Sequence, residues 1–166
     1  MKQNKVEKLL AGVLSISLAM GVNVMPAFAA QVQGPPYEDM SRVYLTKNYE
    51  LANTGTLSPE ETFTFTIDPG TVTDASEGIE AADYVPSVGD VTYQQGEAGS
   101  ANKTRQIEIQ LPKYDSVGVY TYIIHEVAGN SAGVTYYGDA ILLRVTVIEQ
   151  DGKLRIAAVH TEDPES

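Results

Sequence analysis

The sequence has no cysteine, only two histidines, and half as many Lys and Arg (11) as Asp and Glu (22) among its 166 residues. Without cysteine there is no disulfide bond and no thiolate nucleophile, so an exported protein of this size is stabilised by its core or by another covalent device. The formal net charge of −11 argues against nucleic acid and anionic membrane surfaces as partners. No segment shows a sustained helical period.

Motifs for catalysis and for cofactors are also missing. One of the two histidines, His125, directly precedes Glu126, so the two side chains point to opposite faces of a strand. There is no Gly-x-Ser-x-Gly and no phosphate-binding loop, and the acids at positions 74, 77, 80 and 83 do not follow a calcium-loop pattern. The sequence therefore predicts no enzyme, no cofactor and no metal site, and the acids are interpreted as a solvated loop.

The N-terminal stretch is typical of a secretory signal peptide. Three lysines precede an apolar run from Leu9 to Met20, and the small-residue sequence Ala27-Phe-Ala-Ala30 follows. The run is shorter than the roughly 20 apolar residues of a membrane span, so we predict cleavage after Ala29 and no membrane segment in the mature chain. Residues 1–29 are the predicted signal peptide, and residues 30–41, with Gly34-Pro35-Pro36, are a predicted N-terminal arm or linker.

Residues 42–166 are predicted to form one all-β domain. Alternating runs rich in Val, Ile, Thr and Tyr indicate seven strands: Val43–Leu51, Glu61–Ile67, Asp90–Gln94, Thr104–Leu111, Gly118–Val127, Ala140–Ile148 and Leu154–Val159. Turn sequences separate these runs, and Asp151-Gly152 is the clearest hairpin signal. We therefore predict an immunoglobulin-like antiparallel β-sandwich of about seven strands, in which the acid-rich segment 71–88 is a long loop.

Two charged residues lie on strand faces that are otherwise apolar. Lys47 shares a face with Leu45, and Glu126 shares one with Tyr122 and Ile124. A lone buried charge is costly, and burial favours the neutral, nucleophilic form of an amine and the protonated form of a carboxyl group. The alternation leaves a second interpretation open, in which Lys47 extends into solvent at the sandwich edge and Glu126 ends its strand in water.

Several motifs occur in the order seen in a known family. They are Val43-Tyr-Leu-Thr-Lys47, Glu61-Thr-Phe-Thr-Phe-Thr-Ile67, Tyr120-Thr-Tyr-Ile-Ile-His-Glu126, Gly133-Val-Thr-Tyr136 and Leu143-Arg-Val-Thr-Val147. This order resembles the isopeptide-linkage domain of Gram-positive pilins, of the streptococcal major pilin type. The resemblance implies that Lys47 forms an amide bond with an Asn of the last strand and that a buried Glu126 promotes the reaction. It also implies a supporting role for Asp139, for which the alternative is an ordinary turn residue.

The Asn that the resemblance implies is absent from the expected place. The family carries it on a closing strand, whereas this sequence ends at His160-Thr-Glu-Asp-Pro-Glu-Ser166. The Asn residues after the leader adjoin Lys47 or fall in predicted turns: Asn48, Asn53, Asn102 and Asn130. Three interpretations remain open. The sequence stops before its closing strand, which we favour, or the bond does not form, or an acid such as Asp139 replaces the Asn.

The predicted function is structural: a secreted, pilin-like module at the cell surface or cell wall of a Gram-positive bacterium. The resemblance implies other pilin or surface subunits as partners, joined by a sortase, and exposure makes Lys103, Lys113 and Lys153 candidate acceptors. The alternative is an adhesin domain without a crosslink. Such a domain would hold a host protein or sugar on the loop 71–88 or on its tyrosines.

Overall fold

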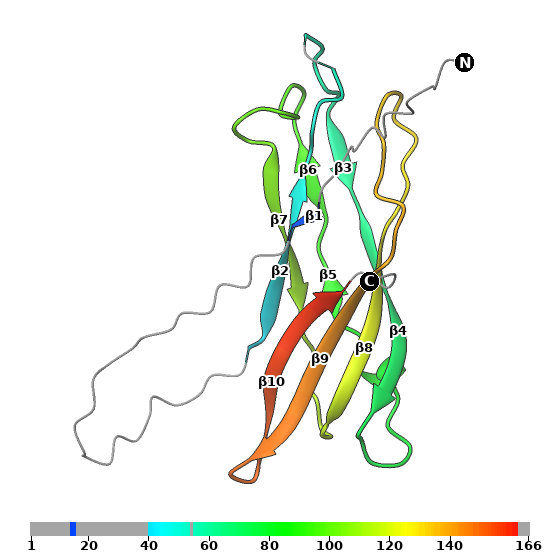
Figure 1. The fold of residues 1–166 in the computed structure, drawn as a ribbon, viewed down its shortest axis with the longest axis vertical. Helices are drawn as coiled ribbons and strands as arrows, with labels where there is room; N and C mark the ends of the chain where they lie inside the picture. Colours follow the sequence, from blue (N-terminus) through cyan, green and yellow to red (C-terminus); the bar gives the residue numbers. More distant parts are fainter. Residues whose placement is uncertain (1–13, 16–39, 54, 163–166) are drawn as a thin grey trace, which may run out of the picture.

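Strands make up about half of the residues described by the computed structural model, which are 14–15, 40–53 and 55–162 (Figure 1). The strands are β1 (Leu14–Ser15), β2 (Arg42–Asn48), β3 (Glu61–Phe63), β4 (Phe65–Thr73), β5 (Ser87–Val88), β6 (Val91–Tyr93), β7 (Thr104–Gln110), β8 (Gly118–Glu126), β9 (Ile141–Gln150) and β10 (Lys153–Glu162). A 3-10 helix, η1 (Ala81–Tyr84), precedes β5, and these ranges contain no α-helix. The predicted signal peptide and N-terminal arm lie outside the described residues, apart from residues 14–15 and 40–41.

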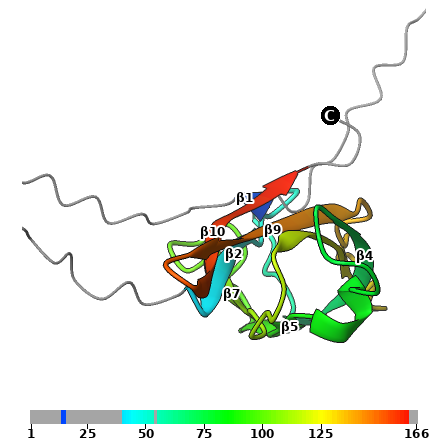
Figure 2. The same cartoon turned by 90° about the horizontal axis from the view of Figure 1, so that it is seen from below.

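The strands form a sandwich of two four-stranded sheets. One sheet has the order β1-β2-β7-β5 and the other the order β10-β9-β8-β4, while β3 and β6 form a separate pair. All the strand pairs of the described residues are antiparallel. Figure 2 shows the two sheets as layers around a common interior. The predicted antiparallel β-sandwich is therefore confirmed.

The alternation of the strands builds the core between these layers. In β2, β8 and the first part of β9, every second residue is buried. The core includes Leu45, Ile107, Ile109, Ile124, Leu143 and Val145, which are almost completely inaccessible. Each such side chain contributes roughly 1.5–3 kcal/mol by leaving water, so an extensive apolar core is available to stabilise a chain without disulfides.

The strand predicted at 61–67 is two strands in the structure. β3 pairs with β6 and β4 pairs with β8, and Thr64 lies between the two. The Thr64 carbonyl accepts a hydrogen bond from the Val127 amide at 2.9 Å, which ties the junction to the end of β8. The alternation continues through the junction, with Phe63 and Phe65 both buried, so the pattern does not reveal the change of partner.

The predicted loop 71–88 is shorter than expected. β4 continues to Thr73 after a register shift between Pro69 and Val72, and η1 and β5 occupy part of the remainder. Gly70 lies at this bulge, where a Cβ would come within 2.6 Å of the Thr121 carbonyl oxygen, so β4 can approach β8 this closely only at a glycine. The four acids at positions 74, 77, 80 and 83 are exposed, as expected for a solvated loop.

Aromatic side chains, most of them tyrosines, form two clusters in the interior. The first joins η1 to its neighbours and contains Tyr84, Tyr114, Tyr120 and Tyr122. The second includes residues of β3 and β6 and contains Tyr49, Phe63, Tyr93 and Tyr136. Burial raises the pKa of Tyr114 to about 12 and also raises the pKa of Tyr122. Because Tyr120 and Tyr122 are inaccessible to solvent, they belong to the core and offer no surface for a ligand.

Candidate functional site

Lys47 and Glu126 meet inside the sandwich. Lys47 lies near the end of β2 and is 1% exposed, and Glu126 is the last residue of β8 and is 8% exposed. The Lys47 Nζ lies 2.6 Å from the Glu126 Oε2. Since β2 and β8 belong to opposite sheets, the contact crosses the core. The structure therefore has both residues on the inner faces, and it brings together two side chains 79 positions apart.

Aromatic rings enclose the lysine. The Nζ lies 4.3 Å from the centre of the Phe63 ring, and the Tyr93 hydroxyl donates a hydrogen bond to the Lys47 carbonyl oxygen at 2.6 Å. Phe63 and Tyr93 come from β3 and β6, so the two-stranded ladder closes this side of the site. The ring face offers weak electrostatic attraction to a cation but no hydrogen-bond acceptor equal to a carboxylate. Glu126 is therefore the main polar partner of the amine among the described residues.

The second carboxylate oxygen of Glu126 faces the chain that follows β8. The Tyr137 amide donates a hydrogen bond to Glu126 Oε1 at 3.3 Å, which is at the long end of the range for such bonds. Glu126 is thus bonded on one oxygen to an amine and on the other to a backbone amide. A buried pair of this kind recovers its desolvation penalty only through short, well-satisfied contacts.

This arrangement is suited to proton transfer. A proton that moves from Nζ to Oε2 along the 2.6 Å hydrogen bond turns an ammonium and carboxylate into a neutral amine and a carboxylic acid, with no net charge added to the interior. The amine is then a nucleophile, and the acid can donate to a carbonyl or to a leaving nitrogen. Because both groups are buried, water competes little for either of them.

The other residues singled out in the sequence make no hydrogen bond to this pair within the described part of the chain. Asp139 is exposed, in a bend before β9, so its supporting role stays a prediction. His125 points to the opposite face of β8 from Glu126 and is partly exposed. The Asn48 side-chain oxygen Oδ1 accepts a hydrogen bond from the Thr104 hydroxyl at 2.7 Å, on the face of β2 away from Lys47. The remaining Asn side chains of the described residues after β2 are exposed: Asn53, Asn102 and Asn130.

β2 has a partner on each side. β7 pairs along its whole length, whereas β1 pairs over two residues, with Leu14 opposite Lys47 and Ser15 opposite Thr46. β1 falls within the predicted signal peptide. A strand in the place of β1 therefore runs directly beside Lys47.

Known proteins share this sequence pattern. Residues 43–166 match the FctA family, described as the Spy0128-like isopeptide containing domain. The chain belongs to the FctA family. A pilin of Streptococcus pyogenes serotype M1 is 25% identical over 146 residues, which are 86% of this chain and 43% of that pilin. The chain thus spans less than half the length of this curated relative, and no solved structure matches it significantly.

Membership confirms the resemblance found in the sequence. The family is described as an isopeptide containing domain and the relative is a pilin, which agrees with the prediction that the chain is not an enzyme. In the part of the chain that the structure describes, no helix has the length and hydropathy of a membrane span. The same residues contain no group of three or more potential metal ligands.

A second buried acid of the FctA domain was missed in the sequence. Glu61, the first residue of β3, is 8% exposed, and its Oε1 accepts a hydrogen bond from the Tyr136 hydroxyl at 2.9 Å. Its Oε2 is buried and has no hydrogen-bond partner among the described residues. The sequence contained a signal for Glu61, because alternation places it on the same strand face as Phe63 and Phe65. This is the same pattern that singled out Lys47 and Glu126.

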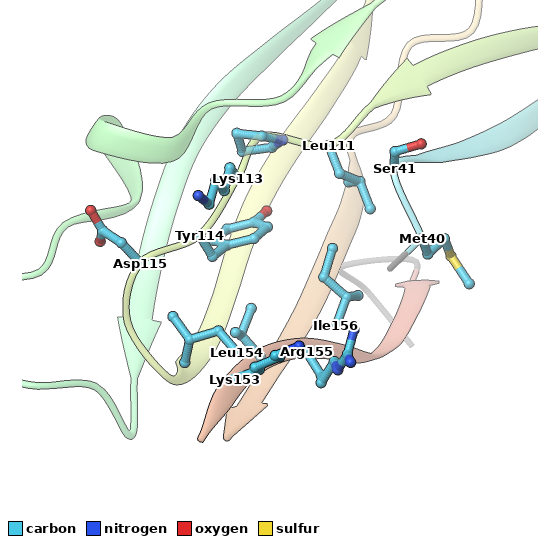
Figure 3. Close-up of a pocket in the computed structure, with 12 residues that line it drawn as sticks. Met40, Ser41, Leu111, Lys113, Tyr114, Asp115, Lys153, Leu154, Arg155 and Ile156 are labelled. Atoms are coloured by element: carbon cyan, nitrogen blue, oxygen red, sulfur yellow. The ribbon is translucent and has the colours of Figure 1, made fainter. Parts of the chain in front are cut away.

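The FctA domain also has a groove beside the first residues of β10 (Figure 3). It has a volume of about 570 Å³ and lies between the segment 111–115, residues 40–41 and β10. Figure 3 shows Leu111, Tyr114 and Ile156 facing the hollow. Lys113 and Lys153 line the same groove, are exposed, and have no carboxylate partner within the described residues.

Proposed function

We propose that this FctA domain is a pilin-like surface module stabilised by an intramolecular amide bond between Lys47 and an Asn side chain, with Glu126 as the proton carrier. The observation that carries the proposal is the 2.6 Å contact of Lys47 Nζ with Glu126 Oε2 in the core. The family description, an isopeptide containing domain, supports it. Such a bond supplies the covalent device that a chain without cysteine otherwise lacks.

The proposed reaction balances without any added reagent. Glu126 accepts a proton from Lys47 Nζ, and the neutral amine attacks the carbonyl carbon of the Asn carboxamide. The C–N bond to Lys47 forms and the bond to the carboxamide nitrogen breaks as Glu126 donates its proton to that nitrogen, which departs as ammonia. Nζ loses its second proton to Glu126, so the amide is neutral and Glu126 ends protonated. The reaction occurs once per molecule, so it is self-modification and not turnover.

We place the acceptor Asn on a strand outside the described residues that runs along β2, where β1 pairs opposite Lys47. An Asn on such a strand, with its side chain turned inward, would reach the Lys47 amine and the Glu126 carboxyl together. The link would then join β2 to its neighbour covalently and carry tension in place of hydrogen bonds. By analogy with a disulfide that closes a loop of about 100 residues, its effect on the unfolded state would be about 4–5 kcal/mol.

Intact-mass spectrometry of the full-length protein tests this proposal. The expected mass is lower than the sequence mass by one ammonia, and tandem fragmentation of a digest should show a branched peptide at Lys47. Lys47→Arg and Glu126→Gln should each restore the full sequence mass. The control is Lys103→Arg, which changes a lysine paired with Glu50 at the surface and should leave the ammonia loss intact. An unmodified mass in the full-length wild-type protein would refute the proposal.

We also propose that the leader 1–29 directs export and that a sortase joins the module to other pilin subunits. The three candidate acceptor lysines differ in their surroundings. Lys103 Nζ lies 2.6 Å from Glu50 Oε1, whereas Lys113 and Lys153 are exposed beside the groove. We therefore favour Lys113 or Lys153 as the acceptor. Peptide mapping of polymer from cells should find the branch at one of these two, and a branch at Lys103 would contradict the assignment.

A further inference from the structure

The buried Glu61 carboxyl has no evident role in stability. A buried carboxyl with one unbonded oxygen is unfavourable, and unsatisfied groups of this kind in native proteins often mark a functional requirement. The one hydrogen bond made by the Glu61 carboxyl among the described residues comes from the Tyr136 hydroxyl at 2.9 Å. This bond therefore identifies what Glu61 does in the fold: it holds Tyr136.

Tyr136 is held tightly for a side chain on an irregular segment. Its ring packs against Phe63 with centroids 5.7 Å apart, and a Cβ on Gly129 would lie 2.3 Å from its hydroxyl oxygen, so the preceding chain passes close over it. Residues 127–140 contain no strand or helix. The hydroxyl bond to Glu61 therefore anchors a segment that has no ladder of its own.

The next residue along the chain contacts the proposed proton carrier. The Tyr137 amide donates to Glu126 Oε1 at 3.3 Å, while Glu126 Oε2 meets Lys47 Nζ at 2.6 Å. A carboxylate held on both oxygens has a fixed plane, whereas one held only by the amine can rotate about its last bond. The position of the Tyr137 amide thus decides whether Oε2 stays aligned with the amine.

We propose that Glu61 is a positioning residue for Glu126, acting through the Tyr136 hydroxyl and the Tyr137 amide. The inference rests on the proposed crosslinking reaction. Glu61 does not touch the reacting atoms. It fixes the segment that orients the Glu126 carboxyl, and the buried, half-satisfied carboxyl of Glu61 is retained for this purpose.

Three variants of the full-length protein test the proposal. Glu61→Met removes the acceptor at similar volume, Tyr136→Phe removes the donor, and Glu61→Gln keeps an oxygen that can accept from Tyr136. Crosslinking is followed during cell-free synthesis by denaturing samples at intervals and measuring the fraction that has lost ammonia. Thr62→Val is the matched control, because Thr62 lies next to Glu61 on β3 but bonds to Thr92 on the exposed face.

We expect Glu61→Met and Tyr136→Phe each to slow crosslinking about three- to tenfold, which is the scale of one hydrogen bond. The double variant should be no slower than either single variant, and Glu61→Gln and Thr62→Val should react as wild type. In the Lys47→Arg background, Glu61→Met should change thermal stability little, because removal of the unfavourable buried carboxyl offsets the lost Tyr136 hydrogen bond. A purely structural role would instead couple slower crosslinking to lower stability, and this result would overturn the proposal.

Hydrogen exchange of the Tyr137 amide separates failure of this proposal from failure of the crosslink itself. In a Lys47→Arg background, which cannot form the bond, Tyr136→Phe should speed exchange of this amide, while exchange at Ile124, in the β8–β9 ladder, stays unchanged. If wild type forms no crosslink but Tyr137 exchange responds, the reaction fails and the positioning contact stands. If Tyr137 exchange does not respond, the positioning role is refuted whether or not the crosslink forms.

Discussion

Replacing Lys47 and Glu126 by Met, singly and together, measures how strongly the buried pair is coupled. Among the described residues, Lys47→Met leaves the Glu126 carboxyl with the Tyr137 amide at 3.3 Å as its one remaining partner, and Glu126→Met leaves the lysine amine against the Phe63 ring at 4.3 Å. Removing one partner of a buried ion pair costs about 3–5 kcal/mol, whereas replacing both by apolar side chains is often neutral or stabilising. The double variant should therefore be more stable than either single variant by about 3–5 kcal/mol.

The comparison among these three variants does not depend on the proposed crosslink, because none of them has both the amine and the carboxyl that it needs. Urea unfolding at neutral pH is a suitable assay. For a slope of about 2 kcal/mol/M, the midpoint of the double variant should exceed those of the single variants by about 2 M. Equal slopes across the series would show that the same surface is exposed in each unfolding transition.

A matched control lies on the surface of the same domain. Lys103 Nζ and Glu50 Oε1 are also 2.6 Å apart, but their side chains are 39% and 32% exposed. The same set of substitutions there should give a coupling of at most about 1 kcal/mol, because solvent screens the pair. If the Lys47 and Glu126 double variant is no more stable than the better single variant, the two side chains are not a coupled buried pair, and the reasoning is wrong.

Two further predictions concern other parts of the fold. Gly70→Ala should lower stability by about 1–3 kcal/mol, because its Cβ would lie 2.6 Å from a backbone oxygen. The control is Gly138→Ala, whose Cβ meets nothing within 4 Å, so this variant should melt as wild type. Equal melting temperatures for the two variants would contradict the prediction. Stability should fall between pH 10 and pH 12, because burial raises the pKa of Tyr93 to about 12, so the folded state keeps a proton that the unfolded chain releases. In urea unfolding across this range, Tyr93→Phe should lose less stability than wild type, and an equal loss would exclude this group.

Local patterns predicted most of the strands. Alternation over 104–111 and 118–127 matches β7 and β8 to within one residue at each end, because one face of each strand is buried and the other is not. The division of the predicted strand 61–67 into β3 and β4 was not predictable from the sequence. Phe63 and Phe65 are both buried on one face, and this alternation is the same for one continuous strand as for two strands with different partners. Hydrogen bonding to distant strands made that choice.

The site was predictable only in part. Alternation and motif order singled out Lys47 and Glu126, but the pattern also allowed both residues to face solvent. The role of Glu61 depends on Tyr136, which is 75 positions away on an irregular segment, and no local pattern connects the two. Contacts made by a segment without regular structure follow from packing, so sequence periodicity does not report them.

The sequence by itself determined the strand content, the acidic surface, the absence of disulfides and the two charges on apolar faces, because composition and side-chain alternation act locally. Only the tertiary structure decided that the two charges meet at 2.6 Å, since their strands belong to opposite sheets and the distance depends on how those sheets pack. The tertiary structure also decided that Phe63 covers the amine and that the segment holding Tyr136 reaches Glu126. A buried pair gains its chemistry from the exclusion of water, and that exclusion exists only after the sheets have closed over it.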